Sequence, residues 1–118
     1  MSPKRGDDVP PPPIDDEWRL RFATNEAAKG WGELCAEAPG NSRRCFEALR
    51  SSPASNSDPD RQHRLRGRLA TATLGGTTYP QWEYEVTAGG RVRYLIDEPR
   101  HTVHLVYAST RHPKDTDS

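Results

Sequence analysis

Residues that could transfer protons or stabilise a phosphate gather within residues 81–96. Two carboxylates, Glu83 and Glu85, are followed across a Gly-containing segment by two guanidinium groups, Arg91 and Arg93. A positioned carboxylate can move protons, and a preorganised guanidinium can stabilise negative charge that develops on a phosphate. These residue types are suited to RNA cleavage without a metal, in which the 2′-hydroxyl loses a proton, the leaving 5′-oxygen gains one and the phosphorane charge is held.

Further basic residues precede and follow this stretch. Residues 61–68 read Arg-Gln-His-Arg-Leu-Arg-Gly-Arg and supply four candidate phosphate-binding side chains, Arg61, Arg64, Arg66 and Arg68. Arg111 and His112 lie just past the last predicted strand, where His112 could transfer a proton. The other three histidines (His63, His101 and His104) have no evident partner in the sequence, so no role is predicted for them.

Each of these features also has a structural explanation. Glu85 and Arg93 could form a cross-strand ion pair worth a few tenths to about 1 kcal/mol, and taken alone this explanation is favoured. The arginine-rich run could equally protect the edge of a sheet from aggregation. Cys35 and Cys45 fit no metal-ligand spacing and fall on predicted apolar helix faces, so we predict small core residues, no metal site and no cofactor.

The alternation of residue types predicts a β-hairpin that carries the charged groups. Two alternating segments flank Ala88-Gly89-Gly90, which predicts a three-residue loop with a Gly available for the left-handed position. The predicted cross-strand pairs are Val86 with Val92 and Tyr84 with Tyr94 on an apolar side, and Glu85 with Arg93 and Thr87 with Arg91 on an ionic side. A slip of one residue would turn the charges into the core, so the register of the hairpin should be firm.

The remaining patterns predict a strand, two helices and then three or four strands. Residues 18–22 alternate as a half-buried strand. A helix begins after Thr24 or Asn25 and ends at Pro39-Gly40, and a second begins at Asn41 or Ser42. Strand character returns at residues 65–74, and the apolar segment 102–109 predicts a central strand. We therefore predict an α+β fold: a mainly antiparallel twisted sheet of order β-α-α-β-β-β, with a helical hairpin on one face and the ionic face open.

Composition divides the chain into three parts. Residues 1–17 are acidic and contain Pro10 to Pro13, which predicts a disordered leader; residues 18–112 form the folded domain, and residues 113–118 a flexible tail. Outside the leader there are 15 basic and 12 acidic side chains, so the neutral formal charge hides a mildly basic domain. The N-terminus has no signal pattern and no apolar run approaches a membrane span, so we expect a cytoplasmic protein without membrane contact.

The order of elements and several motifs resemble the RelE/ParE-like superfamily of type II toxin–antitoxin toxins. The segments that carry this resemblance are Trp18 to Phe22, the helical hairpin, Leu65-Arg-Gly67, Trp82-Glu-Tyr-Glu-Val86, Gly90-Arg-Val-Arg-Tyr-Leu-Ile96 and Ala108-Ser-Thr-Arg-His112. Together they cover residues 18–112. The most specific portion is Leu-x-Gly followed by the aromatic strand and Gly-Arg-Val-x-Tyr.

The resemblance implies a toxin that is neutralised by a cognate antitoxin and that, in the RelE branch, cleaves mRNA on the ribosome without a metal. By motif, Arg91 resembles the family's phosphate-contacting strand arginine, and Arg111 and His112 resemble C-terminal basic and acid–base positions. Glu85 lies on the strand where the RelE branch has a lysine. The alternative that the same scaffold allows is a non-enzymatic module, either a ParE-like gyrase inhibitor or a catalytically silent binding protein.

Overall fold

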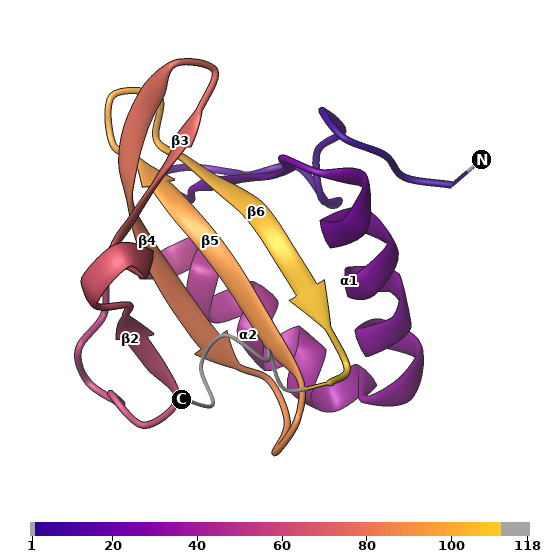
Figure 1. Cartoon of the computed structure of the whole chain (residues 1–118). Coiled ribbons are helices and arrows are strands. Elements are labelled where there is room, and N and C mark those ends of the chain that lie inside the picture. Colours follow the sequence, from indigo (N-terminus) through magenta and orange to yellow (C-terminus); the bar gives the residue numbers. More distant parts are fainter. Residues whose placement is uncertain (1, 112–118) are drawn as a thin grey trace.

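The computed structural model describes residues 2–111 and contains a mixed six-stranded sheet with two helices on one of its faces (Figure 1). The elements are β1 (Arg19–Phe22), α1 (Asn25–Glu37), α2 (Pro39–Ser51), β2 (Gln62–Arg64), the 3₁₀ turn η1 (Gly67–Leu69), β3 (Thr71–Leu74), β4 (Thr77–Glu85), β5 (Arg91–Asp97) and β6 (Thr102–Ser109). His112 and the predicted tail, residues 113–118, lie outside the described residues. Neither helix in residues 2–111 is long and apolar enough to cross a membrane.

The strand order in the sheet is β1-β6-β5-β4-β2, and β3 pairs with the outer part of β4. β1 runs parallel to β6, and the other pairs are antiparallel. The predicted α+β class and the central position of residues 102–109 are therefore confirmed. Five strands follow the helices because β2 lies before the segment predicted as one strand at residues 65–74. Within that segment only Thr71–Leu74 form a strand, and Gly67, whose φ of +63° favours glycine, begins the 3₁₀ turn.

The two helices form the predicted pair, with one shifted boundary. Thr24 caps α1, since its Oγ1 accepts a hydrogen bond of 2.9 Å from the backbone N–H of Ala27. α2 begins at Pro39, which the sequence analysis assigned to the end of the first helix. Proline suits the first position of a helix because the N–H it lacks would have no helical partner there.

The hydrophobic core lies between the helices and one face of the sheet. Trp82, Tyr84, Val92 and Tyr94 are buried in it, on the side that the sequence predicted would be covered by helices. Cys45 is fully buried and Cys35 packs against the core from its edge, as small core residues do. The Tyr94 hydroxyl donates a hydrogen bond of 2.7 Å to the Pro53 carbonyl, which ties the loop after α2 to the sheet.

The leader is ordered over its described residues, in contrast to the prediction of disorder. Its backbone runs antiparallel to β1, with hydrogen bonds from Val9 N–H to Leu20 O and from Phe22 N–H to Asp7 O. The Val9 side chain is 2% exposed and belongs to the core. Because β1 would otherwise be an unpaired edge, the leader completes that side of the sheet.

The β4–β5 hairpin keeps its predicted faces but has a different register. Tyr84 lies opposite Val92, Glu83 opposite Arg93, and Glu85 opposite Arg91. The predicted pairs are thus wrong by two residues, a shift that leaves every side chain on its expected face. The loop is five residues long, from Val86 to Gly90, and is closed by a hydrogen bond from Val86 N–H to Gly90 O.

Candidate functional site

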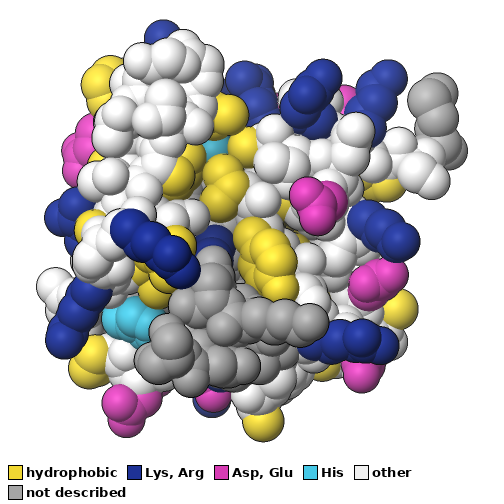
Figure 2. Space-filling model, in the orientation of Figure 1, with side chains coloured by type: hydrophobic (Ala, Val, Ile, Leu, Met, Phe, Trp, Pro, Cys, Tyr) yellow, Lys and Arg dark blue, Asp and Glu magenta, His cyan; other side chains and the backbone are white. Residues whose placement is uncertain are grey.

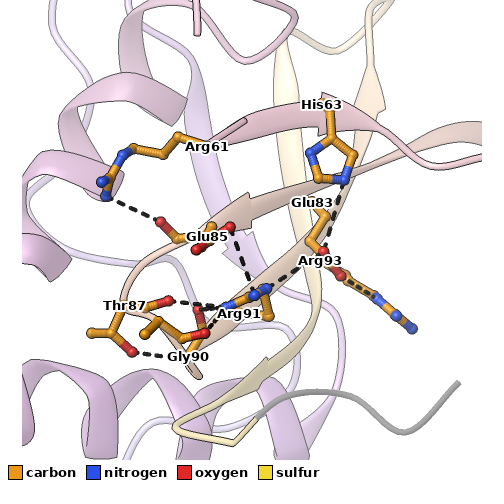
Figure 3. Close-up of polar contacts among 9 residues, drawn as sticks. Arg61, His63, Glu83, Glu85, Thr87, Gly90, Arg91 and Arg93 are labelled. Carbon is orange, nitrogen blue, oxygen red and sulfur yellow. Dashed lines mark hydrogen bonds and ion pairs between the residues drawn. The ribbon is translucent and has the colours of Figure 1, made fainter. Parts of the chain in front are cut away.

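Glu83 on β4 is the centre of a charged cluster on the sheet face opposite the helices (Figure 3). Its carboxylate accepts a hydrogen bond of 3.0 Å from Arg93 Nε and lies 3.7 Å from Arg91 Nε. It also lies 3.8 Å from Nε2 of His63, its neighbour on β2. The Glu83 side chain is 6% exposed, so this buried carboxylate is surrounded by basic groups from two neighbouring strands.

Arg91 holds the β4–β5 loop in place. Its Nη1 donates hydrogen bonds of 2.9–3.1 Å to the backbone carbonyls of Thr87, Ala88 and Gly90. Its Nη2 lies 3.6 Å from Glu85, and the side chain is 9% exposed. The sequence predicted an exposed guanidinium that contacts a phosphate, whereas these contacts give Arg91 a structural role in the loop.

Arg93 is likewise buried, with its guanidinium 5.6 Å from the centre of the Tyr107 ring. The sequence predicted an open ionic face, but the face is closed at Arg91 and Arg93, whose side chains are buried. Glu85 is half-buried, and its backbone carbonyl accepts a hydrogen bond of 3.3 Å from Arg61. Glu83, which the sequence places with Glu85 on the ionic face, is the carboxylate that the cluster surrounds.

The candidate phosphate-binding arginines are exposed beside this cluster. Arg61, Arg64, Arg66 and Arg68 all have exposed side chains on or next to β2 and η1. A cavity of about 450 Å³ opens among them, lined by Pro59, Asp60, His63, Arg64, Leu65 and Arg66. His63 is thus the residue that joins the buried carboxylate to the exposed basic segment, and its side chain is 38% exposed.

Basic side chains also lie around the rest of this sheet face, and hydrophobic side chains are visible between them (Figure 2). Arg19 and Arg21 of β1 are on this face, and both form ion pairs with Asp8 of the leader. Arg111 is exposed just beyond β6, and its backbone N–H donates to Ser109 Oγ. The predicted proton-transfer residue His112 is outside the described residues, so its distance from the cluster is not defined.

A second polar cluster lies at the other end of β5. His104 Nε2 is 3.1 Å from Asp97 Oδ2, and the Arg100 backbone N–H and guanidinium each lie 3.4 Å from the same carboxylate. Asp97 is 1% exposed. Burial by itself raises the pKa of Asp97, but the hydrogen bonds from His104 and Arg100 outweigh burial and hold that pKa below its ordinary value.

All three histidines without a predicted role therefore have partners. His63 faces Glu83, His104 faces Asp97, and His101 stacks on Trp18 at a ring separation of 4.0 Å. Each partner lies on another strand or another segment of the chain, so no local spacing could reveal it.

The arrangement can bind anions and transfer protons. Exposed guanidinium groups are suited to phosphates, and an imidazole beside a carboxylate is suited to general acid–base chemistry. Within residues 2–111, no group of three or more His, Cys, Asp and Glu side chains is placed to hold a metal ion.

Comparisons with protein-family models, with curated proteins and with solved structures find no match for this chain.

Proposed function

We propose that this protein is the toxin of a type II toxin–antitoxin system, a RelE-type endoribonuclease that cleaves mRNA on the ribosome and is neutralised by a cognate antitoxin. The observation that carries the proposal is the position of the exposed arginine segment, residues 61–68, beside a buried cluster of carboxylate, guanidinium and imidazole groups. The segment supplies phosphate contacts, and the cluster supplies a group that can move protons.

The α+β architecture supports the same proposal. Helices cover one sheet face, while the other face has basic residues at its rim, which is the division expected of a toxin that binds RNA on the uncovered side. Bidentate guanidinium contacts to successive phosphates give an affinity that falls as salt is raised. In this proposal Arg64 and Arg66 bind phosphates, and Arg91 and Arg93 hold Glu83 in place. Arg111 and His112 add C-terminal contacts to the RNA.

One observation favours a second candidate, a non-enzymatic module that acts by binding a protein such as gyrase. Arg91 is saturated by loop carbonyls and by two carboxylates, and this guanidinium is the one that motif resemblance assigns to the scissile phosphate. A binding module needs no free guanidinium at that position. The two candidates differ in their cellular effects, which makes them separable.

The test is induced expression of the full chain in bacteria, followed by mapping of mRNA 5′ ends and by an SOS reporter. Cuts at defined codon positions during growth arrest support the endoribonuclease. An SOS response with intact mRNA supports the gyrase-binding alternative, and normal growth with intact mRNA contradicts the toxin proposal.

A matched pair of variants tests the arginine segment. The double change Arg64→Ala/Arg66→Ala should weaken arrest and mRNA cleavage, because two exposed phosphate contacts are lost. The control Arg43→Ala/Arg44→Ala removes the same charge from exposed positions on α2, on the opposite side of the sheet, and should leave both effects unchanged. Equal behaviour of the two variants would refute the assignment.

A further inference from the structure

We propose that His63 is the catalytic base of RNA cleavage and that Glu83 is its positioning residue, with the scissile phosphodiester bound in the cavity beside Arg64 and Arg66. This inference rests on the proposed endoribonuclease function. It places the proton transfer at the boundary between β2 and β4 rather than at the strand arginines or the C-terminal residues. Three observations lead to it.

The first observation is the direction of the imidazole. Nε2 of His63 points toward the Glu83 carboxylate at 3.8 Å, as Figure 3 shows. The Nδ1 atom has no hydrogen-bond partner among the contacts that the described residues form. A carboxylate behind one ring nitrogen favours the proton on that nitrogen, which leaves the other as the base.

The second observation is the rigidity of the carboxylate. Glu83 is buried and is held by Arg93 at 3.0 Å and by Arg91, which is itself fixed by three loop carbonyls. The carboxylate therefore cannot turn away from His63 without breaking a buried ion pair, which is costly. Such support is what a proton-transferring residue needs to keep its orientation.

The third observation is what shares the cavity with His63. Arg64 and Arg66 line it together with the imidazole, and both guanidinium groups are exposed. A phosphate held by them would share the cavity with His63. Asp60, the acidic residue of the same lining, leaves the two cations in excess, so an anion is the favoured occupant.

The reaction is an internal transesterification of RNA. His63 Nδ1 takes the proton of the ribose 2′-hydroxyl, the 2′-oxygen forms a bond to phosphorus, and the bond from phosphorus to the 5′-oxygen breaks. The 5′-oxygen takes a proton from the imidazolium, which restores the neutral ring. The products are a 2′,3′-cyclic phosphate and a 5′-hydroxyl end, and no other reactant is consumed. Glu83 stabilises the imidazolium between the two proton transfers.

The experiment measures cleavage of mRNA on purified, programmed ribosomes by the full chain and its variants. His63→Ala should lower the rate about 10²–10⁴-fold, which is the usual contribution of a general acid–base group. The control His101→Ala removes an exposed histidine remote from Glu83 and should leave the rate unchanged. Binding of an mRNA with a 2′-deoxy nucleotide at the scissile position should be the same for wild type and His63→Ala, since the change affects the reaction and not the phosphate contacts.

The role of Glu83 is tested by a pH profile. The groups that face His63 are Glu83 from β4 and Asp60, Arg64 and Arg66 from the cavity lining, with Arg91 and Arg93 behind Glu83. Glu83→Gln should move the acid limb of the pH–rate profile, and Glu83→Asp should restore part of the lost rate. If Glu83 had only a structural role, Glu83→Gln would lower the rate without moving the acid limb of the profile.

The outcomes separate this inference from the proposed function. If the wild-type chain cleaves no mRNA on the ribosome, the proposed function fails and this inference fails with it. If the wild type cleaves and His63→Ala cleaves as fast with the same pH profile, the function stands and His63 is not the base. Cleavage that depends on His63 but yields 5′-phosphate ends would overturn the transesterification.

Discussion

Gly30 of α1 lies directly against the backbone of Ala108 in β6, so closely that a Cβ placed on Gly30 would be 1.7 Å from the Ala108 carbonyl oxygen. This contact sets the distance between the helix and the centre of the sheet. Gly30→Ala should therefore destabilise the fold by about 3 kcal/mol or more, because backbone cannot move aside as a side-chain tip can. Urea unfolding followed by far-UV circular dichroism measures the change.

Gly32, one residue beyond Trp31 on the same helix, provides the control. A Cβ on Gly32 meets nothing within 4 Å, so Gly32→Ala should stabilise α1 by about 0.5–1 kcal/mol through helix propensity. Both glycines lower helix propensity, so the sequence alone does not distinguish them. Equal effects of the two substitutions would show that α1 does not pack on β6 at Gly30.

Arg91 gives a prediction that separates a structural from a catalytic role. Arg91→Ala removes donors from three loop carbonyls and one partner of buried Glu83, so unfolding free energy should fall by about 3 kcal/mol. Arg64→Ala, at an exposed position, should change it by less than about 0.5 kcal/mol. Thermal unfolding of both variants makes the comparison, and an Arg91 variant as stable as wild type would contradict the structural role.

The sequence predicts the faces of the β4–β5 hairpin but not its register. Alternation has a period of two, so a shift of two residues keeps Glu83, Glu85, Arg91 and Arg93 on one face and is invisible to the pattern. The loop decides the register. Its length follows from the carbonyl contacts of Arg91 and from close packing at Gly90, where a Cβ would lie 2.8 Å from Leu34 Cδ2. The contact at Gly90 depends on Leu34, a residue distant in the sequence.

The candidate site could be predicted only in part, because strand pairing decides which of its residues meet. The exposed arginine segment follows from composition and was found, whereas the partner of His63 depends on the pairing of β2 with β4. The pair of Asp97 and His104 depends on the pairing of β5 with β6, which contains an irregularity between Arg93 and Tyr94. Local patterns identify which residues are polar, but strand register determines which of them meet.

The leader shows how a single apolar residue can outweigh composition. Proline and acidic residues predict disorder, yet Val9 is buried in the core beside β1. Val9→Ala should destabilise the protein by about 1–3 kcal/mol, because it leaves a cavity at that edge of the core. Ile14→Ala is the control, since Ile14 is 66% exposed and its removal should cost little. Differential scanning fluorimetry distinguishes them, and equal melting temperatures would mean that the leader does not contribute to the core.

The buried carboxylate of Asp97 makes the stability of the folded protein depend on pH. Its pKa in the folded protein lies below the ordinary value of about 3.9, despite burial, because His104 and Arg100 donate to the carboxylate. Unfolded chains therefore bind a proton at Asp97 before folded ones do as the pH falls. The stabilisation is complete above about pH 5 and is lost as the pH drops through the folded-state pKa.

Asp97→Asn should remove this response and destabilise the protein at neutral pH by about 1–3 kcal/mol, since the charged hydrogen bonds to His104 and Arg100 are lost. Urea unfolding at a series of pH values from 7 to 2.5 measures both effects. Other carboxylates contribute to acid unfolding, so the informative quantity is the difference between wild type and variant, which should begin to shrink below about pH 5. A difference that is constant over the whole range would show that Asp97 does not exchange its proton on unfolding, and that its contacts act through packing alone.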